Sequence, residues 1–353
     1  DPYDRVPYCG PDPIVVVLRR LEHFLAHPEL YTEHYSPELL PRLVAGTEKV
    51  RAQLEKESRL HQLMSALCGR SIRISLILAQ RLIDNSVYDP TQDHDVTATD
   101  MDRALLIGVG DTFISSPQNV VENIFEVSDH PTGSYFIKLR ILRALRQAGP
   151  EGLRISRLID VMSAFEYDLQ LVCSAINDMK REQKRLLWSD SLKGEFKDET
   201  ELVNYSRSRI IITSVGEGYD SFAPHSLSYL QEVMLDTAVD AHEFGGPWNY
   251  GSLEDRFTLI YKFLRLLHEE DMLEMRKCMG NFSALEYQKA FGKREILSTN
   301  LIRRIRSQVD NILGAVHQAR SRVGFDEFFA EHIRAYDDHL VRATNFERQI
   351  FAA

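Results

Sequence analysis

Residues 209–219 read RIIITSVGEGY and carry the clearest local signal of structure in the chain. Residues 210–213 are β-branched, and three of them are isoleucine, which favours a strand. Gly216 and Gly218 follow at once, and glycine permits the tight turn that leads from a strand into a helix. We therefore expect a strand over residues 209–213 and a helix that begins after Ser214.

The residues before this strand predict a second strand and three helices. The second strand is expected at residues 186–188, and the polar segment 190–208 between the strands is expected to be a loop. Asp168 is placed to cap the last of the three helices. The helices are expected at residues 136–148, 156–164 and 168–183. This order, three helices and then strand, loop and strand, is typical of a winged helix whose wing is the polar loop.

The sequence as a whole predicts a mainly α-helical protein with one two-stranded element. A helical subdomain is expected at residues 1–85, with helices near residues 14–27, 46–67 and 71–84. A polar connector follows at 86–134, then the winged-helix domain with the following helix at 135–240. A C-terminal helical bundle is expected at 241–353, because glycines near residues 245–251 mark a boundary before three long helical segments.

The long helix expected at residues 293–323 has an apolar seam. Its apolar residues recur at alternating spacings of three and four, which is a heptad pattern. They are Ile302, Ile305, Val309, Ile312, Val316, Ala319 and Val323. Two interpretations remain open: the seam packs inside this chain's bundle, or it binds another subunit, so self-association or a protein partner through the C-terminal helices is expected.

Charge divides the last two helices. The segment 293–323 carries seven Lys and Arg against Glu295 and Asp310, whereas the next helix is rich in Asp and Glu. We expect the two helices to pair as antiparallel neighbours with complementary charge. The alternative is a basic face for nucleic acid or an acidic partner.

Composition limits the classes of function. The formal net charge is −10, which argues against a protein that coats nucleic acid non-specifically. The four cysteines are widely separated, so we expect reduced thiols and a cytoplasmic location. The sequence has no apolar run long enough to span a membrane and no secretory signal, so no membrane partner is expected. Because the chain begins Asp1-Pro2-Tyr3 without methionine, we expect it to be a fragment.

Motifs for common catalytic sites are missing from the sequence. There is no GxxxxGK[ST] loop, so this chain alone should not hydrolyse ATP, and ATP and magnesium would bind only if a core outside this sequence supplied that loop. HExxH and GxSxG are also missing, so no catalytic residue and no metal ligand is predicted. His23 and His27 lie four residues apart and could share a helix face, but surface histidines explain the pair better than a metal does, and His332 and His339 have still less support.

The third helix of the expected winged helix is the candidate for nucleic-acid contact. Val172, Ala175, Ile176 and Met179 should face the core, which leaves Asp178 and several polar residues outward. The DNA-binding candidates are Gln170, Ser174, Asn177, Arg181, Lys184 and Arg185, with Lys193 and Lys197 in the wing. Residues 136–223 hold fourteen Lys and Arg against thirteen Asp and Glu, which is a weak phosphate footprint. A winged helix used as a packing or regulatory domain is the plainer interpretation.

Two segments resemble parts of a known family. Residues 209–219 and 229–237 resemble the winged-helix region of prokaryotic STAND-like ATPases. Residues 69–76, GRSIRISL, are similar to the start of a lid helix in AAA+ ATPases, with a serine where alanine is usual. The resemblance implies that residues 1–85 are lid-like and that Arg70 or Arg73 senses nucleotide phosphates.

The resemblance also implies a function. It suggests a non-catalytic regulatory and interaction region of a larger P-loop ATPase that couples nucleotide state to a partner or to DNA, in a family often active in defence against phage. Two alternatives stay open: a stand-alone winged-helix DNA-binding protein, and a protein–protein assembly subunit.

Overall fold

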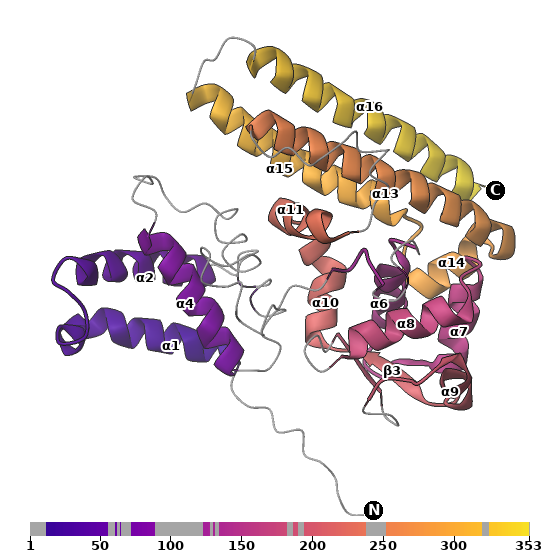
Figure 1. Cartoon of the computed structure of the whole chain (residues 1–353), viewed down its shortest axis with the longest axis horizontal. Helices are drawn as coiled ribbons and strands as arrows, with labels where there is room; N and C mark the ends of the chain where they lie inside the picture. Colours follow the sequence, from indigo (N-terminus) through magenta and orange to yellow (C-terminus); the bar gives the residue numbers. More distant parts are fainter. Residues whose placement is uncertain are drawn as a thin grey trace, which may run out of the picture. The chain divides into compact units, whose positions relative to one another are not determined.

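The computed structural model describes residues 12–55, 61, 64, 72–88, 123–127, 130, 134–181, 186–189, 194–237, 252–319 and 325–352. These residues are mainly helical, with one three-stranded sheet (Figure 1). The chain forms two compact units that divide between residues 121 and 122, inside the expected connector. The expected boundaries near residues 135 and 240 remain predictions.

Unit 1 is built from α1 (Pro13–Ala26), α2 (Leu39–Glu55) and α4 (Ile72–Tyr88), with the 3-10 turn η1 (Pro28–Tyr31) after α1. Each of the three α-helices packs against the other two. The first begins where the Asp12 carboxylate accepts the Ile14 N–H at 2.8 Å and Pro13 takes the first helical position. A mainly apolar pocket of about 440 Å³ lies among these helices.

The second helix of unit 1 differs from its prediction. It begins at Leu39, whereas a start at Gly46 was expected, and Gly46 is a buried residue inside the helix. A glycine is a weak helix former but does not end a helix that tertiary packing stabilises. In α4, Ser75 is fully buried, and its hydroxyl donates to the Ile72 carbonyl at 2.7 Å.

The first part of unit 2 surrounds a small sheet. In chain order it contains α6 (Ile137–Ala148), β1 (Leu153–Arg154), α7 (Ile155–Ser163), α8 (Leu169–Lys180), β2 (Leu187–Ser189), α9 (Glu199–Asn204) and β3 (Arg209–Ile212). The strand order is β1-β3-β2, and both pairings are antiparallel. In the register, Leu153 lies opposite Ile210, and Leu187 lies opposite Ile212.

Two predictions for this part were wrong. The sheet has three strands and not two, because Leu153–Arg154 pairs with β3. A strand of two residues is too short to show an alternating pattern of apolar and polar side chains. Leu153–Arg154 is recognisable as a strand only from its pairing with β3, which is distant in sequence. The segment expected to be a wholly polar loop also contains α9, which the Asp198 side chain caps by accepting the Glu201 N–H.

The remainder of unit 2 is helical. The helical stretch expected from Ser214 to about Ala238, with an interruption at Pro224, consists of α10 (Ser214–Ser221), the turn η3 (Ala223–His225), which contains Pro224, and α11 (Leu227–Asp236). Four helices follow among the described residues, and Ser283 and Glu286 form a capping box at the start of the second of them. They are α13 (Leu253–Asn281), α14 (Ala284–Phe291), α15 (Leu297–Ala319) and α16 (Phe325–Ala352). Among the described residues, none of the helices combines the length and the apolar character needed to cross a membrane.

Helix α15 begins at Leu297, four residues later than expected. Carboxylates from two other helices hold its first turn: Glu347 accepts the Ile296 N–H at 2.7 Å, and Asp271 accepts the Ser298 N–H at 2.8 Å. These acceptors satisfy donors that a helix start leaves free. Periodicity alone could not place this start, because both acceptors are distant in sequence.

The first half of the apolar seam of α15 packs inside the chain, whereas Ile312 and Val316 are half-buried. Ile302, Ile305 and Val309 are buried where α15 contacts α13 and α16. The expected charge pairing with α16 is present at Arg306, whose guanidinium donates to Asp337 at 3.0 and 3.2 Å. Val323, at the end of the expected seam, lies outside the described residues.

A buried ion network joins α6 to α13. The Arg140 side chain is 1% exposed, and its guanidinium donates to Asp271, Glu274 and the Tyr167 hydroxyl. The group also lies 4.2 Å from the centroid of the Phe165 ring. Burial favours neutral Arg140, but the charges led by Glu274 outweigh burial and raise its pKa. Helix α6, which packs on the sheet, is therefore connected to the C-terminal helix α13 by a buried charge that Asp271 and Glu274 compensate.

Candidate functional site

Helix α8 carries most of the predicted nucleic-acid contacts. Its start is fixed by Asp168, whose carboxylate accepts the Leu171 N–H at 2.6 Å. The residues expected to face the core, Val172, Ala175, Ile176 and Met179, are all buried. On the other side, Gln170 is exposed, whereas Ser174 and Asn177 are half-buried.

The outward placement of Asp178 was wrong. Its side chain is 1% exposed and forms an ion pair of 2.9 Å with Lys138 of α6, which is equally buried. Arg181 also approaches the Asp178 carboxylate, at 3.2 Å. A buried carboxylate needs such partners. The helix therefore uses this charge to bind α6 and not to face solvent.

Asn177 holds a segment of the chain over α8. Its side-chain amide donates to the Phe196 carbonyl at 2.7 Å, and its amide oxygen accepts the Phe196 N–H at 2.7 Å. Phe196 is 2% exposed, and the Lys180 ammonium lies 4.2 Å from the centroid of its ring. We call residues 194–204, which include α9, the cover of α8, because they occupy the second half of its outward face.

The cover is acidic. It carries Glu195, Asp198, Glu199 and Glu201, and Arg181 pairs with Glu195 at 3.4 Å. Burial raises the pKa of the Cys173 thiol beneath it to about 11, with further contributions from Glu199 and Asp198. Burial also lowers the pKa of Lys180 to about 8. This face would repel phosphate, and Asn177 has no free amide atom with which to read a base.

Several other predicted site residues are isolated or not described. Arg73 is exposed in the first turn of α4, and Lys197 is exposed in the cover. Arg70, Lys184, Arg185 and Lys193 lie outside the described residues. The structure therefore brings Asn177 and Arg181 together at the cover, but it does not assemble the predicted DNA-binding set as one surface.

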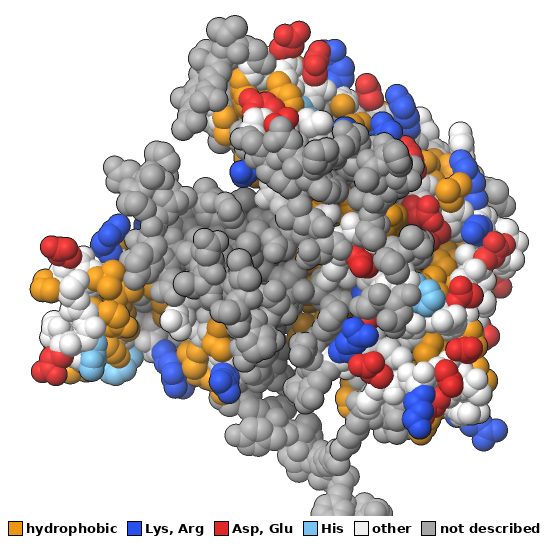
Figure 2. Space-filling model, viewed as in Figure 1, with side chains coloured by type: hydrophobic (Ala, Val, Ile, Leu, Met, Phe, Trp, Pro, Cys, Tyr) orange, Lys and Arg blue, Asp and Glu red, His pale blue; other side chains and the backbone are white. Residues whose placement is uncertain are grey.

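Charge on the viewed face of unit 2 is mixed. Figure 2 shows Lys and Arg side chains interspersed with Asp and Glu, with no single basic area on that face. A protein that binds duplex DNA electrostatically normally presents a contiguous basic stripe. This distribution agrees with the fourteen basic and thirteen acidic residues in the segment 136–223.

The histidine pairs have no metal-binding arrangement in the part of the chain that is described. The His23 and His27 rings contact each other edge to face, with centroids 5.1 Å apart, at the end of α1. No group of three or more metal-binding side chains occurs among the described residues. His332 and His339 instead lie in an aromatic cluster between α13 and α16, together with Tyr261, His268 and Tyr336.

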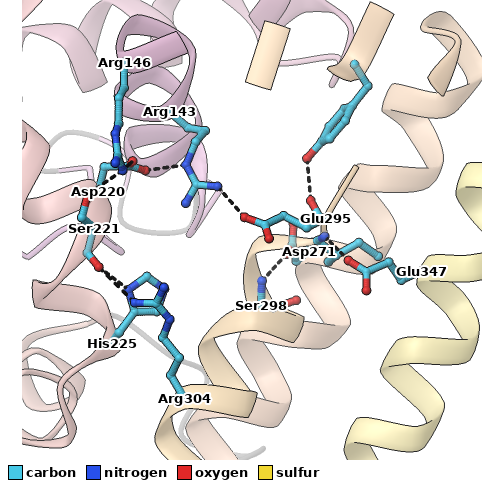
Figure 3. A network of polar contacts seen from close by, with 12 residues as sticks. Arg143, Arg146, Asp220, Ser221, His225, Asp271, Glu295, Ser298, Arg304 and Glu347 are labelled. Carbon is cyan, nitrogen blue, oxygen red and sulfur yellow. Dashed lines mark hydrogen bonds and ion pairs between the residues drawn. The ribbon is translucent and has the colours of Figure 1, made fainter. Parts of the chain in front are cut away.

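A basic pocket of about 450 Å³ lies elsewhere in unit 2. It is bordered by α6, the end of α10, η3, the α14–α15 connection and the first turns of α15. Its charged lining residues are Arg143, Arg146, Lys293 and Arg304, with Asp220 and Glu295. We call this site the basic pocket. Figure 3 shows the side chains of α6 and α15 converging on Asp220 and Ser221.

Asp220 organises one wall of the basic pocket. Its carboxylate is fully buried and accepts from Arg143 and Arg146, each at 2.8 Å (Figure 3). Arg143 and Arg146 share a face because they lie three residues apart on α6. Arg143 also donates to Glu295 at 2.9 Å. Burial acts to lower the pKa of Arg143, but Asp220 and Glu295 raise it, so this guanidinium stays charged.

The opposite wall is formed by Arg304, Lys293 and His225. Arg304 donates to the Ser221 carbonyl at 3.3 Å, and Arg146 donates to the Ser221 hydroxyl at 2.5 Å, so both guanidinium groups meet at one residue. The His225 imidazole is uncharged near neutral pH, because its burial and then the charge of Arg304 lower its pKa to about 3. Among the described residues, neither Lys293 nor Arg304 has an ion-pair partner.

Sequence reasoning missed the basic pocket. Arg143 and Arg146 were visible as a pair on one helix face, but their partners come from segments more than 70 residues away. The basic character of residues 293–304 was noticed and was attributed to pairing with α16. Among the described residues of that helix, Arg306 makes this pair, whereas Lys293 and Arg304 line the pocket.

Comparisons with known proteins give no match: no protein-family model, no curated protein and no solved structure matches this chain. The resemblance to AAA+ and STAND-like ATPases thus has no support beyond the residues quoted for it. The geometry of the cover and of the basic pocket is the remaining guide to function.

Proposed function

We propose that this chain is a non-catalytic regulatory and interaction region, and that its residues 135–213 form a winged-helix domain that contacts protein and not duplex DNA. The order helix, strand, helix, helix, strand, short helix, strand supports the winged-helix assignment, as does the antiparallel order β1-β3-β2. In this assignment α8 is the third helix, and the segment between β2 and β3 takes the place of the wing.

The observation that carries the proposal is the cover held by Asn177. In a DNA-binding winged helix, the third helix needs a free outward face to enter the major groove. Here Asn177 binds both backbone polar groups of Phe196, and four carboxylates accompany that segment across α8. Desolvating these carboxylates against phosphates would be unfavourable, whereas a protein partner with basic side chains would complement them.

The family resemblance is the reason for naming a P-loop ATPase as the kind of protein that this region regulates. The sequence lacks the phosphate-binding loop, so the proposed role is to transmit a nucleotide-dependent change that begins outside these residues. The described part of unit 2 supports such a role, because Arg140 connects α6, which packs on the sheet, to the C-terminal helix α13 through buried ion pairs. A link to defence against phage stays within the resemblance.

Fluorescence anisotropy with a labelled 20-base-pair duplex tests the choice between DNA and protein. At about 50 mM salt, where phosphate contacts are strongest, we expect no saturable binding that depends on α8. The variant Gln170→Ala with Ser174→Ala removes the exposed polar groups of α8 and should leave any residual signal unchanged. An exposed double substitution on α13, Lys262→Gln with Arg265→Gln, is the control for overall charge.

Two results would contradict the proposal. One is duplex binding that falls steeply with salt and is lost in the Gln170 and Ser174 variant, because that result would identify α8 as a recognition helix. The other is ATP hydrolysis by the purified chain, because P-loop ATPases need the phosphate-binding loop that this sequence lacks.

A further inference from the structure

We propose that the basic pocket is a binding site for a small ligand that carries at least two phosphoryl groups. The starting observation is the balance of charge around its walls. Four cations line the pocket, Arg143, Arg146, Lys293 and Arg304, against two carboxylates, Asp220 and Glu295. Because the pKa of His225 is lowered to about 3, this histidine adds no charge near neutral pH.

The two carboxylates are already used by one wall. Asp220 accepts from Arg143 and Arg146, and Glu295 accepts from Arg143, so Arg143 has two anionic partners of its own. Arg146 has only its share of Asp220 and is half exposed. The formal excess of about two positive charges therefore lies on Arg146, Lys293 and Arg304. A phosphoryl compound with two negative charges would complement this excess.

The positions of these cations favour a ligand over a solvated surface. Arg146 and Arg304 come from different helices, α6 and α15, yet both guanidinium groups donate to Ser221 (Figure 3). Bringing two guanidinium groups to one residue is unfavourable unless an anion is shared between them. Ser221 offers only neutral oxygen atoms, and within the described residues Asp220 pairs with Arg146 but not with Arg304.

The size of the pocket sets the class of ligand. A volume of about 450 Å³ exceeds what a single phosphate fills and falls within the roughly 300–1,000 Å³ of small-molecule sites. Arginine is suited to phosphoryl oxygens because its planar fork donates two parallel hydrogen bonds. Arg146 and Arg304 are placed to donate to one phosphoryl group and Lys293 to a second.

Isothermal titration calorimetry of the whole chain with inorganic pyrophosphate tests the site at low ionic strength. We expect one pyrophosphate per chain, with a dissociation constant of about 1 mM or tighter. The double variant Lys293→Gln with Arg304→Gln should weaken binding by about tenfold or more, because it removes two charge-assisted donors. Lys262→Gln with Arg265→Gln, which removes the same charge from exposed positions on α13, should change affinity less than about twofold.

The outcomes separate the proposal from general attraction of anions. Equal weakening by the pocket variant and the α13 variant would overturn it, as would no pyrophosphate binding at millimolar concentration. Inorganic phosphate should bind about tenfold or more weakly than pyrophosphate, and equal affinity would contradict the requirement for two phosphoryl groups. A phosphoserine peptide distinguishes the source, since tighter binding of the peptide than of pyrophosphate would overturn a free small-molecule ligand. Both pocket residues are exposed, and an unchanged thermal midpoint would verify that the variant folds.

Discussion

Asn177 and Phe196 are joined by two hydrogen bonds of 2.7 Å, in which one side-chain amide satisfies both the N–H and the carbonyl of a residue 19 positions away. An asparagine pairs with a backbone peptide in this way only when both groups are held in one plane. The contact fixes the cover on α8, and it accounts for the burial of the Phe196 ring and of Cys173 beneath it.

The substitution Asn177→Ala should open the cover. It leaves the two polar groups of Phe196 without partners, which costs about 1–3 kcal/mol of folding stability. We expect Cys173 to react with iodoacetamide at least several-fold faster, because exposure returns the pKa of its thiol from about 11 toward the ordinary value. Peptide-level mass spectrometry measures the rate, and the fully buried Cys278 is the internal control. An unchanged Cys173 rate would show that Asn177 does not hold the cover.

Gly152 and Gly149 offer a matched test of the turn before β1. Both have positive φ, +67° and +78°, but a Cβ on Gly152 would lie 2.2 Å from the Ile210 carbonyl oxygen, whereas one on Gly149 would meet nothing within 4 Å. Gly149→Ala should cost about 1–2 kcal/mol for backbone strain alone. Gly152→Ala should cost about 2–5 kcal/mol, because β1 must also move away from β3. Urea denaturation compares the two variants, and equal losses would contradict this account.

Arg140→Met should be strongly destabilising. It leaves the buried carboxylates of Asp271 and Glu274 without their cation, and breaking a buried ion network in this way costs about 3–5 kcal/mol. The exposed pair of Arg265 with Glu269, at 3.2 Å, is the control, and Arg265→Met should cost less than about 1 kcal/mol. Chemical denaturation gives both values. If Arg140→Met lost no more than the control, the network would not join α6 to α13.

Stability should fall as the pH is lowered through the weakly acidic range. Burial lowers the pKa of His268, His332 and His339 from 6.5 to about 4. Between those values the unfolded chain binds protons that the folded chain excludes, so the free energy of unfolding is full above about pH 7 and declines from pH 6.5 toward 4. For His268, which is 2% exposed, the loss is about 3 kcal/mol.

Unfolding free energies measured from pH 7 to pH 4 check this expectation. His332→Phe should flatten the decline, because it removes one titrating ring and a buried Nε2 atom that has no hydrogen-bond partner. Phe328→Leu removes a ring stacked on His332 but no titrating group, so it should lower the whole curve without changing the slope. The same slope in His332→Phe as in the unaltered protein would exclude His332 as a source of the pH dependence.

Local patterns in the sequence predicted the helices around α8 and the longer C-terminal helices. Asp168 acts as the cap that its position indicated, and residues 209–212 form the expected strand. Local patterns could not predict the features that depend on residues distant in sequence. The strand at Leu153–Arg154 exists through β3, and the start of α15 is set by Asp271 and Glu347.

The candidate site was predictable only in part, for the same reason. Helical periodicity identified Asn177 and Arg181 as residues away from the core, but it could not reveal that the segment 195–196 would bind them. Asp178 was misplaced because a charged residue is normally solvent-exposed, and its buried partner Lys138 lies on another helix. The basic pocket draws on four separate segments, so no single stretch of sequence contains it.

Arg140 also determines where unit 2 can be divided. The glycine-rich stretch near residues 245–251 is where a sequence-based choice would separate the sheet from the C-terminal helices. A cut there would leave the arginine on one fragment and Asp271 and Glu274 on the other, each an ionised group in an apolar surrounding with nothing to neutralise it. We expect neither fragment to fold alone, so truncations and domain exchanges in this protein should keep the whole of unit 2, residues 122–353, together.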